Sequence, residues 1–114
     1  MNQRRTKMIT ATFKVNSVSN DITEFKIKGH AMHAPVGEDI VCAAVSALSI
    51  SIVNSLYDHT DADIELIEYD DGFKIAMNHR SNAAQLLIKT LESGLKSISD
   101  QYPENIDVKK IQHE

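Results

Sequence analysis

The stretch IVCAAVSALSISIVNSLY, residues 40–57, decides how this chain folds. It carries no charged residue, and apolar side chains recur at helical spacing, so the sequence predicts a helix that is apolar on two sides. Its short length and its four serines and one asparagine favour burial in protein over burial in lipid, so no membrane association is expected. A sheet should cover one side of this helix, and a second helix or a second copy of the chain should cover the other. The two apolar stripes are Val41, Val45, Leu48, Ile52 and Leu56, and Ile40, Ala43, Ala47 and Ile50.

On both sides of this helix, the sequence alternates between apolar and polar residues, which is typical of half-buried strands. Alternation predicts strands over 9–15 and 23–28, joined by a turn at 16–21, and a hairpin with its turn at Asp71–Gly72. Asp39 is the expected N-cap of the first helix, and Ser81 or Asn82 that of a second. The second helix should pack through a stripe of Ala83, Leu87, Leu91, Leu95, Ile98 and Tyr102. A last short strand should hold Ile106 and Val108.

The predicted order of elements is β-β-α-β-β-α-β. Hairpins that alternate with single helices indicate an α+β sandwich with a largely antiparallel sheet and two helices. The chain of 114 residues fits one domain, which we place at 8–114 after a flexible N-terminal leader at 1–7.

Charge and cysteine content restrict the functions that fit this chain. The net charge of −4 at pH 7 disfavours direct binding of nucleic acid, which needs a basic face. The single cysteine excludes an internal disulfide and suits a reducing compartment. The first residues, MNQRRTK, do not lead into an apolar signal segment, so a cytoplasmic location is expected.

Two residues could carry chemistry. Cys42 stands at the predicted start of the first helix, where unpaired N–H groups stabilise a thiolate, although a free cysteine is often an inert packing residue. His30 follows Gly29 at a predicted strand end, although alone it would be read as a surface histidine. A loop between them can fold back and bring imidazole and thiol together, the minimum for nucleophilic acyl transfer. N–H groups of the same helix turn could then hold the oxyanion.

Other roles for residues of this region stay open. His30, His33, Cys42 and His79 could ligate zinc, but they lack a compact spacing signature, so neither a metal nor another cofactor is expected. Asp39 could orient His30 instead of capping the helix. Ser46, one turn beyond Cys42, could bond near the thiol or only pack. Gly29 and Gly37 could act as hinges of the loop.

The segment GHAMHAPVGEDIVCAAVSAL, residues 29–48, resembles the ribosomal-processing cysteine protease family, Prp. The matching positions are Gly29, His30, Ala31, Gly37, Asp39, Ile40, Val41 and Cys42. The Leu-rich second helix ending in Tyr102–Pro103 and the strand with Ile106 and Val108 also resemble the family, so the likeness runs from Met8 to about Ile111.

The resemblance implies a cytoplasmic homodimeric endopeptidase of ribosome biogenesis. It would remove a short N-terminal extension from a large-subunit ribosomal protein precursor, cutting after an aromatic residue. By motif position His30 would be the base and Cys42 the nucleophile, and the loop between them would close over the peptide. Met32, Val36 and Ser46 are the expected contacts of the substrate.

The chain departs from the family pattern inside the loop. Met32 stands where a smaller or polar residue is frequent, and Pro35 stands where an acidic one is frequent, which affects substrate fit more than the His30–Cys42 pair. The alternative function is a non-catalytic ribosome-associated binding protein that kept the fold. Such a protein would have no need of a thiol at a helix start paired with a histidine.

Overall fold

The computed structural model of the chain describes residues 8–29 and 36–113, with the side chains of 36–39 outside that description. Its elements confirm the predicted order β-β-α-β-β-α-β. In chain order they are β1 (Ile9–Asn16), β2 (Ile22–Lys28), α1 (Val36–His59), β3 (Ile64–Tyr69), β4 (Gly72–Met77), α2 (Asn82–Gln101) and β5 (Ile106–His113).

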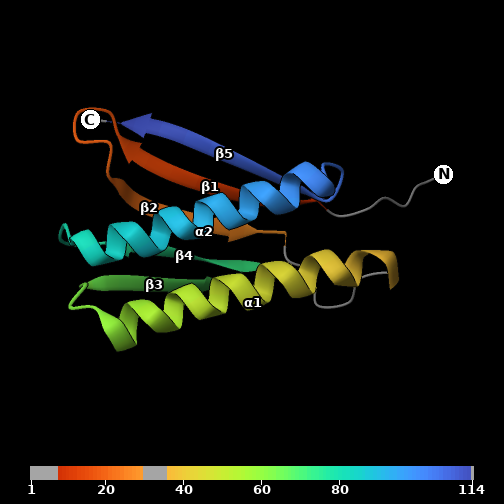
Figure 1. Cartoon of the computed structure of the whole chain (residues 1–114), viewed down its shortest axis with the longest axis horizontal. Helices are drawn as coiled ribbons and strands as arrows, with labels where there is room; N and C mark the ends of the chain where they lie inside the picture. The colour runs from red at the N-terminus through yellow and green to blue at the C-terminus, as the bar shows by residue number, and fades with distance from the viewer. Residues whose placement is uncertain (1–7, 30–35, 114) are drawn as a thin grey trace.

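The five strands form one sheet in the order β3-β4-β2-β1-β5, and both helices lie side by side on one of its faces (Figure 1). All neighbouring strands are antiparallel except β1 and β5, which run parallel, so the prediction of a largely antiparallel sheet is confirmed. The parallel pair is possible because α2 carries the chain back across the sheet before β5 begins. The sheet therefore covers one side of each helix.

The core forms where alternate strand residues meet the helices. Phe13 of β1 and Phe25 of β2 are fully buried and stack with ring centroids 5.8 Å apart, and Phe73 of β4 meets Phe25 edge-on at 5.9 Å. The first predicted stripe of α1 packs against this layer, with Val41, Val45, Ile52 and Leu56 buried and Leu48 partly buried. This stripe fixes which side of α1 faces the sheet.

The two helices approach closely at Gly94 of α2. A Cβ at this position would lie 2.4 Å from Cδ2 of Leu48, so glycine allows the Leu48 side chain to fit against α2. The second apolar stripe of α1 is left uncovered, with Ile40 61% and Ile50 57% exposed. By length and composition alone, Ile40–His59 could cross a membrane, with a mean hydropathy of 1.9 and 28% of that stretch buried in the fold.

The first helix starts earlier than predicted. Its first residue is Val36, so Asp39 lies within the first turn and the prediction that it is the N-cap is wrong. Gly37, which the sequence predicts to lie in the loop, is part of the helix as well. A proline directly before the first helical residue and acidic residues in the first turn are both typical of helix starts, which explains why the helix extends to this point.

The packed face of α2 also differs from the predicted stripe. Ser81 is confirmed as the N-cap, with its hydroxyl accepting from the N–H of Ala84 at 3.2 Å. However, Ala83 and Tyr102 are exposed, and the buried positions are Ala84, Gln85, Ile88, Leu91, Glu92 and Leu95. Two polar residues share this face because Gln85 bonds the backbone of Ile22 through both its amide atoms, at 2.7 and 2.8 Å, and Glu92 pairs with two lysines. Of the predicted stripe, Leu91 and Leu95 are confirmed as buried and Leu87 and Ile98 pack partly buried against the core, so the apolar pattern is wrong at its two ends and misses the two polar positions.

Candidate active site

Cys42 is the seventh residue of α1 and is half-buried against the edge of the core. Residues one, two and three turns further along the same side of the helix are Ser46, Ser49 and Val53. The thiol is thus held by a long, packed helix, on the side that faces the sheet.

The chain leaves β2 toward His30 through Gly29, whose φ is +84°. A Cβ at Gly29 would lie 2.3 Å from the carbonyl oxygen of Met8, so the backbone needs glycine both for its conformation and for space. The N–H of Gly29 donates to Asp71 at 3.3 Å, and the other oxygen of that carboxylate lies 3.7 Å from Nζ of Lys28. These contacts fix the point from which the histidine segment departs.

Several predicted site residues cannot be placed in space. His30 and Met32 lie outside the described residues, as does the loop that was expected to close over a peptide. Val36, Gly37 and Asp39 are described only by their backbone in α1. The pairing of His30 with Cys42 therefore stays a prediction.

A cavity of about 390 Å³ opens between α1 and the β3–β4 hairpin, and we call it the α1–β3 cavity. Ile27, which lines it, lies three residues before His30, and Ser46 lies one helical turn after Cys42. The cavity therefore adjoins the elements that carry both predicted catalytic residues. Its full lining is Ile27, Ser46, Ser49, Ile50, Val53, Asn54, Leu66, Glu68, Tyr69, Asp70, Gly72 and Phe73.

The helix start at Val36 changes the electrostatic argument for Cys42. The N-terminal field of a helix falls off within its first turn, and only the first four N–H groups lack a partner inside the helix. As the seventh residue, Cys42 lies beyond that turn. The N–H groups of its own turn are used within the helix, so the prediction that they form the oxyanion hole does not hold for this arrangement.

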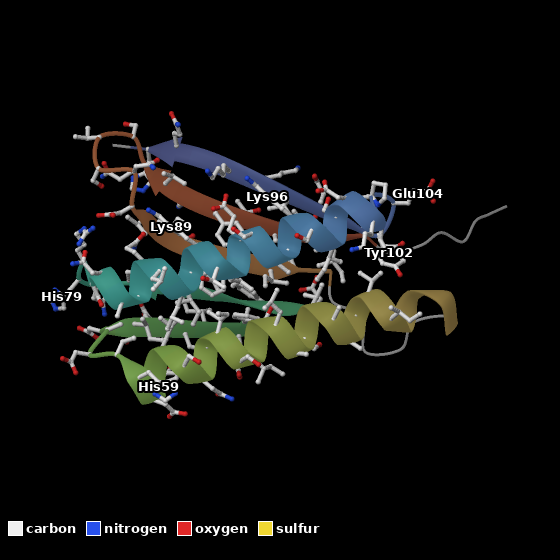
Figure 2. The ribbon with its side chains drawn as sticks, viewed as in Figure 1. His59, His79, Lys89, Lys96, Tyr102 and Glu104 are labelled. Atoms are coloured by element: carbon white, nitrogen blue, oxygen red, sulfur yellow. The ribbon has the colours of Figure 1, made fainter. Side chains whose placement is uncertain are left out.

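The alternative of a metal site gains no support from geometry. Within 8–29 and 36–113, no group of three or more potential ligands is clustered. His79 lies 3.5 Å from Asp63, at the end of the molecule where α1 finishes with His59, whereas Cys42 lies near the start of α1 (Figures 1 and 2). His79 thus cannot join Cys42 in one site.

The structure also shows site residues that the sequence alone did not reveal. The sequence predicts a turn at Asp71–Gly72, but Tyr69 pairs with Gly72, so the two turn residues are Asp70 and Asp71. The carboxylate of Asp71 also accepts the hydrogen bond from the N–H of Gly29. Ser49 lines the cavity, is 2% exposed, and its hydroxyl has no hydrogen-bond partner among the described residues. No local pattern marks either residue, because both roles depend on contacts between distant segments.

Replacing Gly29 with alanine should destabilise the fold by about 1–3 kcal/mol, because the new Cβ would meet the Met8 carbonyl in a backbone conformation disfavoured for alanine. Urea unfolding followed by circular dichroism measures this loss. Gly29→Asn is the informative companion, since asparagine tolerates positive φ but adds the same Cβ. We expect it to be no better than alanine, and wild-type stability in the alanine variant would contradict this account of Gly29.

Comparisons with known proteins identify the class of protein to which this chain belongs. Its fold superposes on the crystal structure of an essential ribosomal processing protease Prp from S. aureus in complex with a substrate peptide, with a TM-score of 0.83 and 31% identity over 91% of this chain and all of that one. A second S. aureus Prp structure, in complex with a covalently linked product peptide, gives a TM-score of 0.82 and 32% identity, again over 91% of this chain and all of that one. The curated Ribosomal processing cysteine protease Prp of Staphylococcus aureus is 36% identical over 103 residues, 87% of this chain and 95% of that protein. The chain is a cysteine protease.

The sequence model of the family described as "Cysteine protease Prp" matches residues 8–107. The chain therefore belongs to the Prp family, as its sequence predicted, and the family is one of ribosomal processing.

Proposed function

We propose that this chain is the cytoplasmic endopeptidase that removes an N-terminal extension from a large-subunit ribosomal protein precursor during ribosome biogenesis. One observation carries this proposal: the chain's only cysteine lies on α1 one helical turn before Ser46, the first residue of the helix to line the α1–β3 cavity, and Ile27 of β2, three residues before His30, lines the same cavity. The name of the S. aureus relative specifies ribosomal processing, and its structure with a covalently linked product peptide supports a covalent route.

In the proposed reaction, His30 takes the proton of the Cys42 thiol, and the thiolate attacks the scissile carbonyl. The tetrahedral intermediate collapses to a thioester as the C–N bond breaks, and the imidazolium gives its proton to the leaving amine. Water then hydrolyses the thioester, again with His30 as base, and releases the extension as a carboxylate. Gly29, whose N–H donates to Asp71, is the last described residue before the segment that carries His30.

The near end of the α1–β3 cavity would receive the aromatic side chain before the scissile bond. Ile27 and Ser46 border this end, and Phe73, which is paired with Ile27 in the sheet, supplies apolar wall. Met32 and Val36 stay as proposed contacts from the loop side. An aromatic side chain fits such a cavity because burial of its ring against apolar walls is the main favourable contribution to its binding.

The direct test is incubation of the purified chain with the precursor of that ribosomal protein from the same organism. Loss of the extension at a single bond, seen by mass spectrometry, is the expected result. If the chain binds the precursor with no cut, the non-catalytic binding protein takes the place of the protease.

We also propose that the chain forms a homodimer, because burial of the exposed second apolar stripe of α1 would stabilise the association of two copies. Ile40, Ala43, Ala47 and Ile50 are exposed along this stripe, and α2 packs on the other flank of the helix. A closed dimer is the commonest way to bury such a surface.

Sedimentation at micromolar concentration should give twice the 12.7 kDa chain mass. Ala47→Glu should weaken association at least about tenfold, because a charge would be buried against its own copy across the two-fold axis. Leu86→Glu is the matched control, since Leu86 is 69% exposed on α2, away from the stripe, and should leave the dimer intact. This interface would be contradicted if the wild-type chain sedimented at 12.7 kDa. It would also be contradicted if Ala47→Glu and Leu86→Glu dimerised with the same affinity.

A further inference from the structure

The face of the sheet that is turned away from the helices, which we call the bare face, is rich in lysine. Both helices lie on the other face (Figure 1). Side chains alternate along a strand, so the neighbours of the buried Phe13, Phe25 and Ile75 point to the bare face. The charged strand residues on the bare face are five lysines and three acidic residues, namely Lys14, Lys26, Lys28, Lys74 and Lys109 with Glu24, Glu65 and Asp107.

One row across the bare face carries lysines with no acidic residue between them. Lys26 of β2 lies directly opposite Lys74 of β4, and on its other side Thr12 of β1 leads to Lys109 of β5. Neighbouring strands are about 4.8 Å apart, so the backbone of Lys26 lies about 5 Å from that of Lys74 and about 10 Å from that of Lys109. Like charges directly opposite each other destabilise a sheet, so the stability of the fold does not explain this row.

The acidic residues of the bare face leave the row with an excess of positive charge. Glu24 is shared by two lysines, at 3.7 Å from Nζ of Lys14 and 4.0 Å from Nζ of Lys74. Lys26, between them, forms no ion pair with any residue in the described ranges. These distances are longer than a hydrogen bond, so the ammonium groups keep their donors for a bound anion. The remaining lysines have one acidic contact each, Lys28 with Asp71 and Lys109 with Asp107, both at 3.7 Å.

The sign of the bare face is opposite to that of the whole chain. Acidic residues outnumber lysines and arginines by 16 to 12, so the composition holds enough carboxylates to neutralise the row. The fold directs them elsewhere, as with Glu68 and Asp70, which line the cavity beside α1. A net charge of −4 averages over all surfaces, so it does not exclude an anionic partner at the bare face.

The groups around the lysine row fit the phosphates of a nucleic-acid backbone. Lysine ammonium groups and threonine hydroxyls are common donors to phosphate oxygens, and Thr10 and Thr12 lie beside the lysines on β1. The strands of the bare face carry a single tyrosine and no phenylalanine, and the ring of Tyr69 is covered by Nζ of Lys28 at 4.9 Å. The bare face therefore offers contacts to phosphates but no platform on which bases would stack.

The bare face and the α1–β3 cavity lie on opposite sides of the sheet. The cavity is enclosed between α1 and the β3–β4 hairpin, on the side that the helices cover. A peptide in the cavity and a polyanion on the bare face can thus be bound at the same time. Ribosomal proteins function on RNA, so RNA is the polyanion that a protease for their precursors would meet.

We propose that the bare face binds the phosphate backbone of RNA, without preference for base sequence, through Lys26, Lys74 and Lys109. The choice of RNA rests on the proposed function, whereas the lysine row itself does not. The enzyme would bind RNA with one side of its sheet and cut the precursor with the other.

The first test measures binding. A fluorescent RNA hairpin of about 20 nucleotides is titrated with the chain at about 50 and 200 mM salt, and anisotropy gives Kd. Three lysine–phosphate contacts should make the affinity fall about 40-fold between the two salt concentrations. Lys26→Gln/Lys74→Gln should weaken binding at the lower salt at least about tenfold and reduce this fall to about three- to fourfold.

The matched control is Lys89→Gln/Lys96→Gln, which removes the same charge from the chain. Both lysines are exposed on α2, on the helix side of the sheet (Figure 2). This variant should change Kd for the hairpin by less than about twofold, because neither lysine lies on the bare face.

The second test separates binding from folding and from catalysis. Because Lys26 and Lys74 repel each other, Lys26→Gln/Lys74→Gln should unfold in urea at a midpoint no lower than that of the wild type. It should also cut a peptide spanning the precursor junction with the wild-type kcat/KM. A lower urea midpoint would show that the lysines serve the fold and would overturn the inference.

The outcomes distinguish this inference from the proposed function. If the wild type does not bind the hairpin at the lower salt, or if both double variants bind it equally, the RNA site is wrong and the protease stands. If polyglutamate displaces the hairpin at the same concentration of charge, the bare face takes acidic proteins and the inference fails. If the chain binds the hairpin as expected but cuts neither peptide nor precursor, the proposed function fails and the RNA site stands.

Discussion

Cys42→Ala should lower the rate of precursor cleavage by at least about four orders of magnitude, because no other group of the chain can form the thioester. The fold should survive, since Cys42 is only partly buried and alanine favours helix, so the free energy of unfolding should change by no more than about 1 kcal/mol. Cleavage of the precursor and urea unfolding are measured on the same preparation.

The matched control for this variant is Ser46→Ala, one helical turn further on the same side of α1. It removes a side-chain polar atom of similar size but no nucleophile, so it should cut within a few-fold of the wild type. Comparable losses in both variants would show that this side of α1 is needed for binding and not for attack.

His30→Ala should reduce cleavage by roughly two to four orders of magnitude, the usual scale of a lost general base. His33→Ala is the control, because it removes an imidazole from the same segment, three residues away, and should leave the rate nearly unchanged. Equal effects of the two substitutions would contradict a specific base at His30.

A second measurement separates a base from a merely structural histidine. The alkylation rate of the single thiol against pH should show its inflection below about pH 8.5, where an ordinary thiol ionises. Because Cys42 lies beyond the first turn of α1, the imidazole of His30 and not the helix terminus should cause this activation. The inflection should therefore return to the ordinary value in His30→Ala and stay low in His33→Ala. An inflection that stays low in both variants would mean that His30 does not activate the thiol.

The sequence predicted the fold well where a regular period met a buried face. The alternation of Ile9, Ala11, Phe13 and Val15 defines β1, and all four side chains are buried against the helices. The inner stripe of α1 was equally clear, because its apolar members repeat at three- and four-residue spacing, although the face also buries Ser49. In these elements the local pattern and the tertiary packing favour the same structure.

The errors lie where contacts between distant segments override the local pattern. The last strand continues to His113, well beyond Val108, because β1 pairs with it over its whole length and not because its residues alternate. Gln85 and Glu92 occupy the packed face of α2 only because Ile22, Lys96 and Lys110 provide partners for them. The start of α1 was missed because Gly37 was read as a breaker, although the helix includes it.

The same distinction holds for the candidate site: the local sequence predicts some of its features, and others depend on contacts between distant segments. The residue types and order of the GHA and GEDIVC segments were enough to predict the class of enzyme, and the comparisons confirm that class. The α1–β3 cavity could not be predicted, because Ile27, Ser49 and Glu68 come from three elements and meet only in the folded chain. The role of Asp71 in holding Gly29 depends on the pairing of β2 with β4 and was hidden for the same reason.

The most direct test of the central claim is to trap the thioester. The chain is mixed with its ribosomal protein precursor, quenched in acid within the first turnover, digested and analysed by mass spectrometry. We predict that the released N-terminal extension is found as an adduct on the peptide containing Cys42, and that Cys42→Ala yields neither adduct nor cleaved precursor. An adduct on any other residue, or cleavage by Cys42→Ala at the wild-type rate, would contradict the account.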